Sequence, residues 1–161
     1  MGKPVLLSEV LGGNLPNPVL IEHRDRYGNL KRRTLSFNTR TNAGRDWQSD
    51  VMGTLGTQPA VSKYVGLTAT NVAIAGTETT LAGEITTGTL ARAIYTAYNH
   101  TAGTATYNQT KTFTSDGTVT LQTAAEFNAA TAGTMPFIAN ISPNAPTVSG
   151  DTLALTWTKN I

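Results

Sequence analysis

The fold is decided by residues 79–114, TTLAGEITTGTLARAIYTAYNHTAGTATYNQTKTFT, in which threonines alternate with small or apolar residues for most of the length. Successive side chains of a β-strand point to opposite faces, so residues 104–114 predict a strand with threonines on one face. The opposite face carries Ala105, Tyr107, Gln109, Lys111 and Phe113. Residues 91–98 predict a second strand, and the glycine-bearing turn at 100–104 joins the two into a hairpin.

Threonine makes up 29 of the 161 residues. Its branched β-carbon fits a pleated strand and its hydroxyl suits an exposed sheet face, so the composition favours an all-β protein. Charged residues are 14% of the chain, a low fraction that indicates a surface packed against neighbouring proteins. A chain of this length can form one domain with a real core and still supply an extended arm.

The chain has no cysteine, which excludes disulfides and thiolate chemistry, so its stability must come from packing or oligomerisation. The first residues lack the basic-then-apolar pattern of a signal peptide. No apolar run approaches the roughly 20 residues needed to span a bilayer. We therefore expect a soluble chain without a membrane partner.

The charge is uneven along the chain. Residues 1–50 hold eight of the twelve basic residues and five of the ten acidic ones, a net charge of +3, whereas the remainder has a net charge of −1. We therefore expect an N-terminal arm over residues 1–56 and a β-domain over residues 57–161. Residues 1–18 are rich in glycine, proline and asparagine, which predicts an extended segment that becomes ordered on a partner.

The rest of the arm predicts a hairpin and a helix. Residues 18–25 and 30–38 are strand-like runs, and the tetrapeptide 26–29 between them has the glycine and asparagine of a turn. Residues 42–53 predict the one short helix, with Trp47 and Val51 on the same face and Gly53 as the C-terminal stop.

From residue 58 onward the pattern predicts only strands and turns. The candidate strands are 63–70, 81–86, 91–101, 104–114, 118–123, 135–141 and 152–159. Polar turns separate them, which is typical of a β-sandwich or barrel of about seven to eight short antiparallel strands. In the last strand, Leu153, Leu155 and Trp157 alternate with small or polar residues and are predicted to be buried.

The residues show no pattern of an active site, and we expect no enzyme activity, catalytic residue, cofactor or metal. His23 and His100 lie far apart without a cluster of possible metal ligands, so both are expected at the surface. There is no nucleophile elbow and no phosphate-binding loop. The acids of the β-domain occur singly beside turns, where we expect them to bond backbone amides: Glu78, Glu84, Asp116, Glu126 and Asp151.

The candidate partner-binding residues are six basic side chains of the arm and one tryptophan: Arg24, Arg26, Lys31, Arg32, Arg33, Arg40 and Trp47. With Tyr27 among them, the basic residues could follow a nucleic-acid backbone. The alternative is that Glu22, Asp25, Asp46 and neighbouring subunits neutralise them. The net charge of the arm is small and it contains no recognition motif, so nucleic acid is not the expected partner.

Several segments occur in a recognisable order: DWQSDVMG at 46–53, GLTAT at 66–70, the stretch 79–114, AAEFNAATAGTMPFIANIS at 124–142 and GDTLALTWT at 150–158. Over these segments the chain resembles small virion structural proteins of tailed bacteriophages. The resemblance covers about two thirds of the chain. It implies an assembly role on the virus particle, and it carries over no catalytic residue.

We therefore expect a non-enzymatic structural component of a phage virion, first of all a capsid decoration or cement protein on the outside of the head. The expected partners are the major capsid protein and neighbouring copies of the same chain, arranged as a homotrimer. One alternative is a tail or head–tail connector component. Another is a host-surface or carbohydrate-binding module, which would need exposed aromatic residues at one end of the sandwich, for which Tyr95, Tyr98 and Tyr107 are the candidates.

Overall fold

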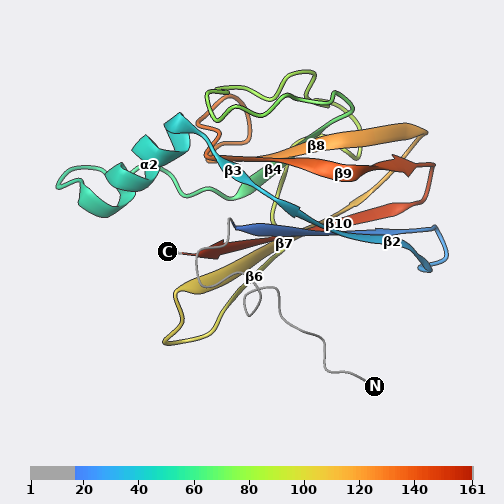
Figure 1. The fold of residues 1–161 in the computed structure, drawn as a ribbon, viewed down its shortest axis with the longest axis horizontal. Helices are drawn as coiled ribbons and strands as arrows, with labels where there is room; N and C mark the ends of the chain where they lie inside the picture. Colours follow the sequence, from blue (N-terminus) through green and yellow to red (C-terminus); the bar gives the residue numbers. More distant parts are fainter. Residues whose placement is uncertain (1–16, 161) are drawn as a thin grey trace.

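Two five-stranded antiparallel sheets pack face to face in the structure, a computed structural model that describes residues 17–160 (Figure 1). Sheet A has the order β2 (Leu30–Phe37), β1 (Pro18–Arg24), β10 (Thr152–Asn160), β7 (Thr106–Thr114) and β6 (Ala97–His100). Sheet B has the order β3 (Thr39–Arg40), β9 (Phe137–Thr147), β8 (Val119–Phe127), β4 (Tyr64–Thr68) and β5 (Ala93–Ile94). The arrangement confirms the predicted all-β sandwich.

The main core lies between the two sheets. In β10, Leu153, Leu155 and Trp157 point inward and are at most 1% exposed, as the alternation predicts. β1 lies beside β10 and adds Val19 and Ile21 to the same layer. Fully burying an apolar side chain of this size contributes roughly 1.5 to 3 kcal/mol to the stability of the fold. Burial of this layer is therefore the main interaction that holds the two sheets together.

The β1–β2 hairpin forms where the sequence predicts it, but it belongs to the sandwich. β1 pairs with β10 along its length, with Val19 opposite Trp157. The expected boundary near residue 57 therefore does not separate the hairpin from the β-domain. After β2 the chain changes sheets at Asn38 and continues as β3 in sheet B. Most of the extended segment predicted for residues 1–18 lies outside the described residues.

The predicted strand at 91–101 is divided between the two sheets. β5 pairs with β4 in sheet B, whereas β6 pairs with β7 in sheet A as the predicted hairpin requires. The chain crosses at Tyr95 and Thr96, whose amides donate to Lys63 O at 3.0 Å and to Thr110 O at 2.9 Å. Backbone bonds to both sheets therefore fix the crossing.

The long connection between β4 and β5 covers the outer face of sheet B, above β8 and β4 in Figure 1. Val72 and Leu81 from this connection pack with Phe127 and Met135 in a second, smaller core. The predicted strand at 81–86 is absent, because Glu84 makes only a single bridge with Thr68. The segment is held by side chains instead of by a ladder of backbone bonds.

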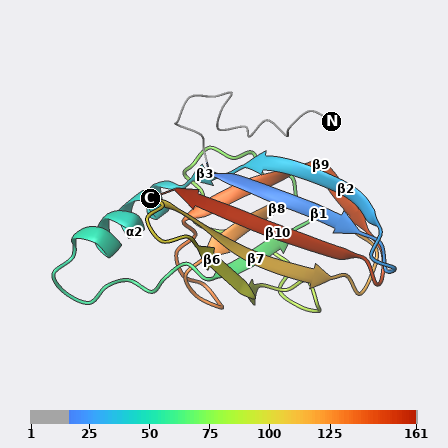
Figure 2. The same ribbon diagram turned by 90° about the horizontal axis from the view of Figure 1, so that it is seen from below.

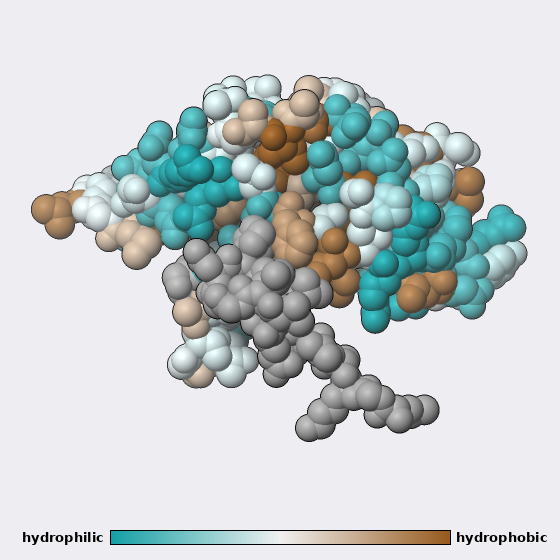
Figure 3. Space-filling model, viewed as in Figure 1, coloured by the Kyte–Doolittle hydropathy of each residue, from teal (hydrophilic) through white to brown (hydrophobic). Residues whose placement is uncertain are grey.

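The helix α2 (Asn42–Gly53) has the predicted bounds and projects from one end of the sandwich (Figure 1). Thr41 caps it by accepting a hydrogen bond from Gly44 N at 2.9 Å. Gly44 lies against Pro136, and a Cβ there would come within 2.6 Å of the Pro136 Cα. Beyond the helix Leu55 is fully exposed, and the surface view in Figure 3 shows hydrophobic atoms at this tip.

Candidate functional site

The seven predicted partner-binding residues lie at two places. Five of them belong to the turn half of the β1–β2 hairpin: Arg24, Arg26, Lys31, Arg32 and Arg33. Arg40 lies in β3, where its guanidinium stands 5.6 Å from the centre of the Phe137 ring, and Trp47 lies in α2. The hairpin residues are therefore one cluster, and the other two belong to a different end of the fold.

Most of the basic hairpin residues have partners within the chain. Arg33 Nε donates to Glu22 Oε1 at 2.7 Å, and Arg32 Nη1 donates to Asn144 O at 2.6 Å. Arg24 Nη1 donates to Gly28 O at 3.0 Å. Lysine and arginine on an edge strand such as β2 also discourage unwanted strand pairing. These contacts within the chain give the basic residues a structural role. Binding of a partner by these residues remains a prediction.

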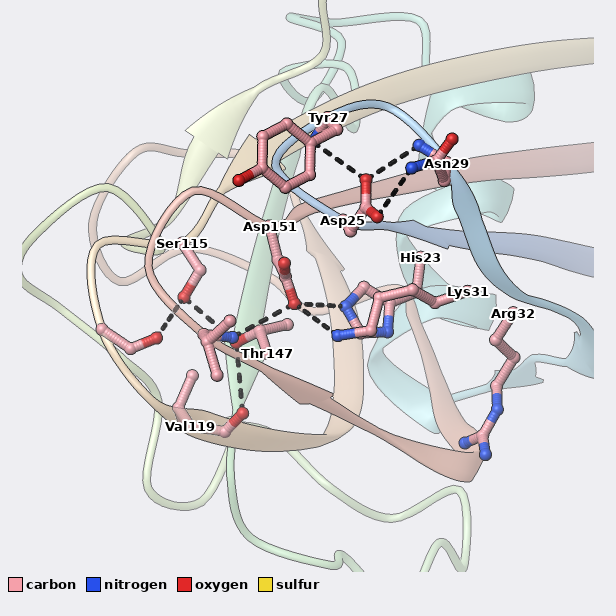
Figure 4. A network of polar contacts seen from close by, with 12 residues as sticks. His23, Asp25, Tyr27, Asn29, Lys31, Arg32, Ser115, Val119, Thr147 and Asp151 are labelled. Atoms are coloured by element: carbon pink, nitrogen blue, oxygen red, sulfur yellow. Dashed lines mark hydrogen bonds and ion pairs between the residues drawn. The ribbon is translucent and has the colours of Figure 1, made fainter.

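Lys31 is a partly exposed member of a polar network around the buried Asp151, in the loop before β10 (Figure 4). Asp151 Oδ2 accepts from Lys31 Nζ at 2.8 Å, lies 3.0 Å from His23 Nε2 and accepts from Val148 N at 3.2 Å. The hydrogen bond from Lys31, with those from His23 and Val148, lowers the pKa of Asp151 to about 2 although burial acts in the opposite direction. Sequence reasoning missed this network because Asp151 is distant from the hairpin in the chain.

Replacing Asp151 with asparagine is expected to remove an acid-sensitive part of the stability. The folded-state pKa lies below the ordinary value of 3.8, so the carboxylate stabilises the fold above about pH 4, and this contribution is lost as the pH falls through 2. The shift corresponds to about 2 kcal/mol at neutral pH.

Urea unfolding between neutral pH and pH 2 measures this effect. Asp151→Asn should be less stable at neutral pH and should lose less stability on acidification than the parent. Asp46→Asn, which changes an exposed acid on α2, is the matched control and should keep the parent's acid dependence. An unchanged acid limb in Asp151→Asn would contradict the role of this carboxylate.

Other titratable residues correct the sequence-based expectations. His23 is 2% exposed and was expected at the surface, and Glu126 is fully buried and was expected beside a turn. Glu84 pairs with Arg92 through both carboxylate oxygens, at 2.6 Å each. Of the five acids of the β-domain, two bond only backbone amides, as predicted. Glu78 accepts from the amides of Ala75 and Gly76, and Asp116 accepts from the amide of Thr89.

The outer face of sheet A is crossed by no described helix or loop, as the view from below shows (Figure 2). The outward positions of β7 and β10 include seven threonines, here called the threonine face: Thr106, Thr110, Thr112, Thr114, Thr152, Thr156 and Thr158. Thr110 and Thr156 lie opposite each other with their hydroxyl oxygens 3.0 Å apart. The remaining outward positions of these strands hold Asn or Ala, so the face carries hydroxyls but no charge.

A pocket of about 110 Å³ lies between α2 and the end of the sandwich. Its lining comes from the helix and from strands β3, β7, β9 and β10: Arg40, Trp47, Gln48, Val51, Met52, Tyr107, Phe137, Lys159 and Asn160. Trp47 is fixed by a bond from its indole Nε1 to Ala60 O at 2.9 Å. The pocket has apolar walls, and the ammonium of Lys159, one of its two basic residues, is already paired with the buried Glu126, so the pocket suits a small apolar group.

The three tyrosines considered for glycan binding are not equivalent. Tyr107 lines the pocket and its ring centre lies 5.5 Å from that of Tyr98, which is 62% exposed. Tyr95 instead donates its hydroxyl to the buried carboxylate of Glu126. Two of the three candidates therefore remain at least partly accessible, and one of them, Tyr107, lines the same pocket as Trp47.

No family model, curated protein or solved structure matches the chain. Within residues 17–160, no group of three or more His, Cys, Asp or Glu side chains is placed to hold a metal ion. None of the helical residues described forms a segment long and apolar enough to cross a membrane.

Proposed function

We propose that this protein is a non-enzymatic structural component of a tailed-phage virion and that it decorates the outside of the capsid. In this proposal the sandwich binds the major capsid protein and neighbouring copies of itself, and the bound layer stabilises the shell. The resemblance of residues 46–158 to virion structural proteins supports a location on a phage particle. The threonine face supports a role in binding other proteins.

The threonine face is the observation that carries the proposal. Interface cores are depleted of charged residues, because a charge removed from water without a partner is costly. The outward positions of β7 and β10 have no such charge, and Leu35 and Phe37 on the neighbouring β2 are 38% and 41% exposed. The same margin also carries Glu22 and Arg33, which pair with each other. A broad sheet face with hydroxyls at its centre, and with apolar side chains and this ion pair at its margin, is suited to bind a protein surface.

Quantitative mass spectrometry of purified particles tests the location. A decoration protein is expected at one copy or one oligomer per capsid lattice position, and it should be released without opening the head. A connector component would instead form one ring at a single vertex, in far fewer copies. Absence of the protein from purified particles would refute the virion role.

A pelleting assay on undecorated heads tests the surface. Thr112→Arg combined with Thr114→Arg puts two charges on exposed positions of the threonine face and should weaken binding by about tenfold or more. The matched control combines Thr57→Arg with Thr131→Arg, two exposed threonines outside sheet A, and should bind like the parent. Equal binding by both double variants would move the contact to another surface.

A carbohydrate-binding module is the second candidate, and the aromatic pocket beside α2 favours it. Stacking of sugar rings on Trp47 in the pocket, and on the exposed Tyr98 next to Tyr107 at its edge, would then supply the affinity. In a glycan array, Trp47→Ala and Tyr98→Ala should abolish binding, whereas Tyr27→Ala should not, because Tyr27 is an exposed tyrosine at the opposite end. The absence of any glycan signal from the parent protein would exclude this candidate.

A further inference from the structure

Lys159 is a buried lysine that contacts both an amide and an acid. It continues the inward face of β10 beyond Trp157, and its side chain is 3% exposed. Its Nζ lies 2.5 Å from Gln109 Oε1 in the neighbouring strand β7. The same Nζ lies 2.5 Å from Glu126 Oε2 in β8 of the opposite sheet, and Glu126 is fully buried.

Aromatic rings enclose this cluster. The Lys159 Nζ lies 5.4 Å from the ring centres of Tyr107 and Phe137 and 5.8 Å from that of Tyr95. Burial, together with the negative charge of Glu126, raises the pKa of Tyr95 well above its ordinary value. The ammonium, carboxylate and carboxamide therefore meet in surroundings with little water.

The two acceptors are held in place by hydrogen bonds. Glu126 accepts from the Tyr95 hydroxyl at 2.5 Å and from Ser62 Oγ at 3.1 Å. The Gln109 carboxamide turns its oxygen to Lys159 and donates from Nε2 to Ser62 O at 3.2 Å. A buried ion pair needs only Lys159 and Glu126. It does not explain why the Gln109 amide is also held against the Lys159 amine.

We propose that Lys159 and Gln109 join in an intramolecular isopeptide bond, with Glu126 as the group that moves the protons. Glu126 takes a proton from the Lys159 ammonium, which leaves a neutral amine. The amine nitrogen then attacks Cδ of Gln109, and the carboxamide becomes tetrahedral. Glu126 passes its proton to Nε2 and takes the second proton from Nζ, the Cδ–Nε2 bond breaks as the Nζ–Cδ amide forms, and the released ammonia carries that proton away as ammonium.

The arrangement supplies what this reaction needs. Holding amine, amide and acid in contact replaces an encounter in solution, which is worth a large factor in rate. A site with little water also keeps hydrolysis from competing with attack by the amine. The bond would tie the last strand to β7 in a chain that has no cysteine. The inference concerns the isolated protein and does not depend on the virion role.

Mass spectrometry of the purified, folded full chain tests the proposal. The intact mass should be lower than that of the sequence by one ammonia molecule. After trypsin, residues 93–111 and 112–161 should appear as one branched peptide joined at Gln109 and Lys159, without cleavage after Lys159. Separate peptides of full mass would overturn the proposal, and loss of water in place of ammonia would overturn the assignment of Gln109 as the acceptor.

Three variants check the roles of the groups. Lys159→Arg keeps the positive charge but cannot form the bond, and Glu126→Gln removes the proton carrier, so both should have the full mass. Lys63→Arg replaces an exposed lysine and should keep the ammonia deficit and the branched peptide. If Glu126→Gln still loses ammonia, the role of Glu126 is refuted. The measurement on the parent protein decides the bond itself, whether or not a variant folds.

Discussion

Replacing Trp157 with alanine is expected to lower the free energy of unfolding by about 3 to 5 kcal/mol. Trp157 is the largest fully buried side chain, and it lies in the central strand of sheet A between β1 and β7. Removal of the indole leaves a cavity between two paired sheets, which cannot close without breaking their strand register.

Trp157→Phe is the control for this prediction. The indole Nε1 has no hydrogen-bond partner in the structure, so phenylalanine gives up volume but no hydrogen bond. We expect it to cost clearly less than alanine in urea unfolding at neutral pH. A loss below about 1 kcal/mol for Trp157→Ala would mean that the inward register of β10 is wrong.

Replacing Glu126 with alanine is expected to cost a similar amount, about 3 to 5 kcal/mol. The substitution leaves the Lys159 ammonium buried among Tyr95, Tyr107 and Phe137 without its carboxylate. It also removes the acceptor of the Tyr95 and Ser62 hydroxyls. A buried charge without a partner is among the costliest changes that a core can undergo.

The double variant Glu126→Leu with Lys159→Met separates the charge effect from the loss of packing. Apolar residues of similar volume often replace a buried ion pair at little cost, so the double variant should recover most of the stability lost in Glu126→Ala. Neither protein can form the proposed isopeptide bond, so their comparison is independent of it. Equal losses in thermal and urea unfolding would show that the pair's charges contribute little.

The local pattern of the sequence was enough for most elements. Period-two alternation predicted the hairpin at 18–38, the strand at 104–114 and the buried side of β10, because it reports which side chains share a face. The spacing of Trp47 and Val51 and the stop residue Gly53 predicted α2, whereas its cap, Thr41, came from the structure. The pattern at 81–86 also alternates, yet no strand runs there, since side-chain contacts hold that segment over sheet B.

For the candidate sites, the sequence supplied residue types but not their neighbours. The basic residues of the hairpin were identified, and Asp151 was expected to bond backbone amides, but its bonds from Lys31 and His23 were not predicted. A signal for Lys159 was present, because it occupies the next inward position after Trp157 in the alternation of β10. The outward threonines were predicted for β7, but their alignment with those of β10 required the strand pairing.

The sequence by itself determined that the chain is all-β, where most strands run and which faces are apolar, because these depend on backbone geometry and side-chain period alone. Only the tertiary structure decided that β1 lies beside β10, that residues 91–101 divide between two sheets, and that Lys159, Gln109 and Glu126 meet. Such pairings join segments far apart in the chain, and they are selected by the backbone hydrogen bonds and apolar burial of the whole sandwich, which no local pattern contains.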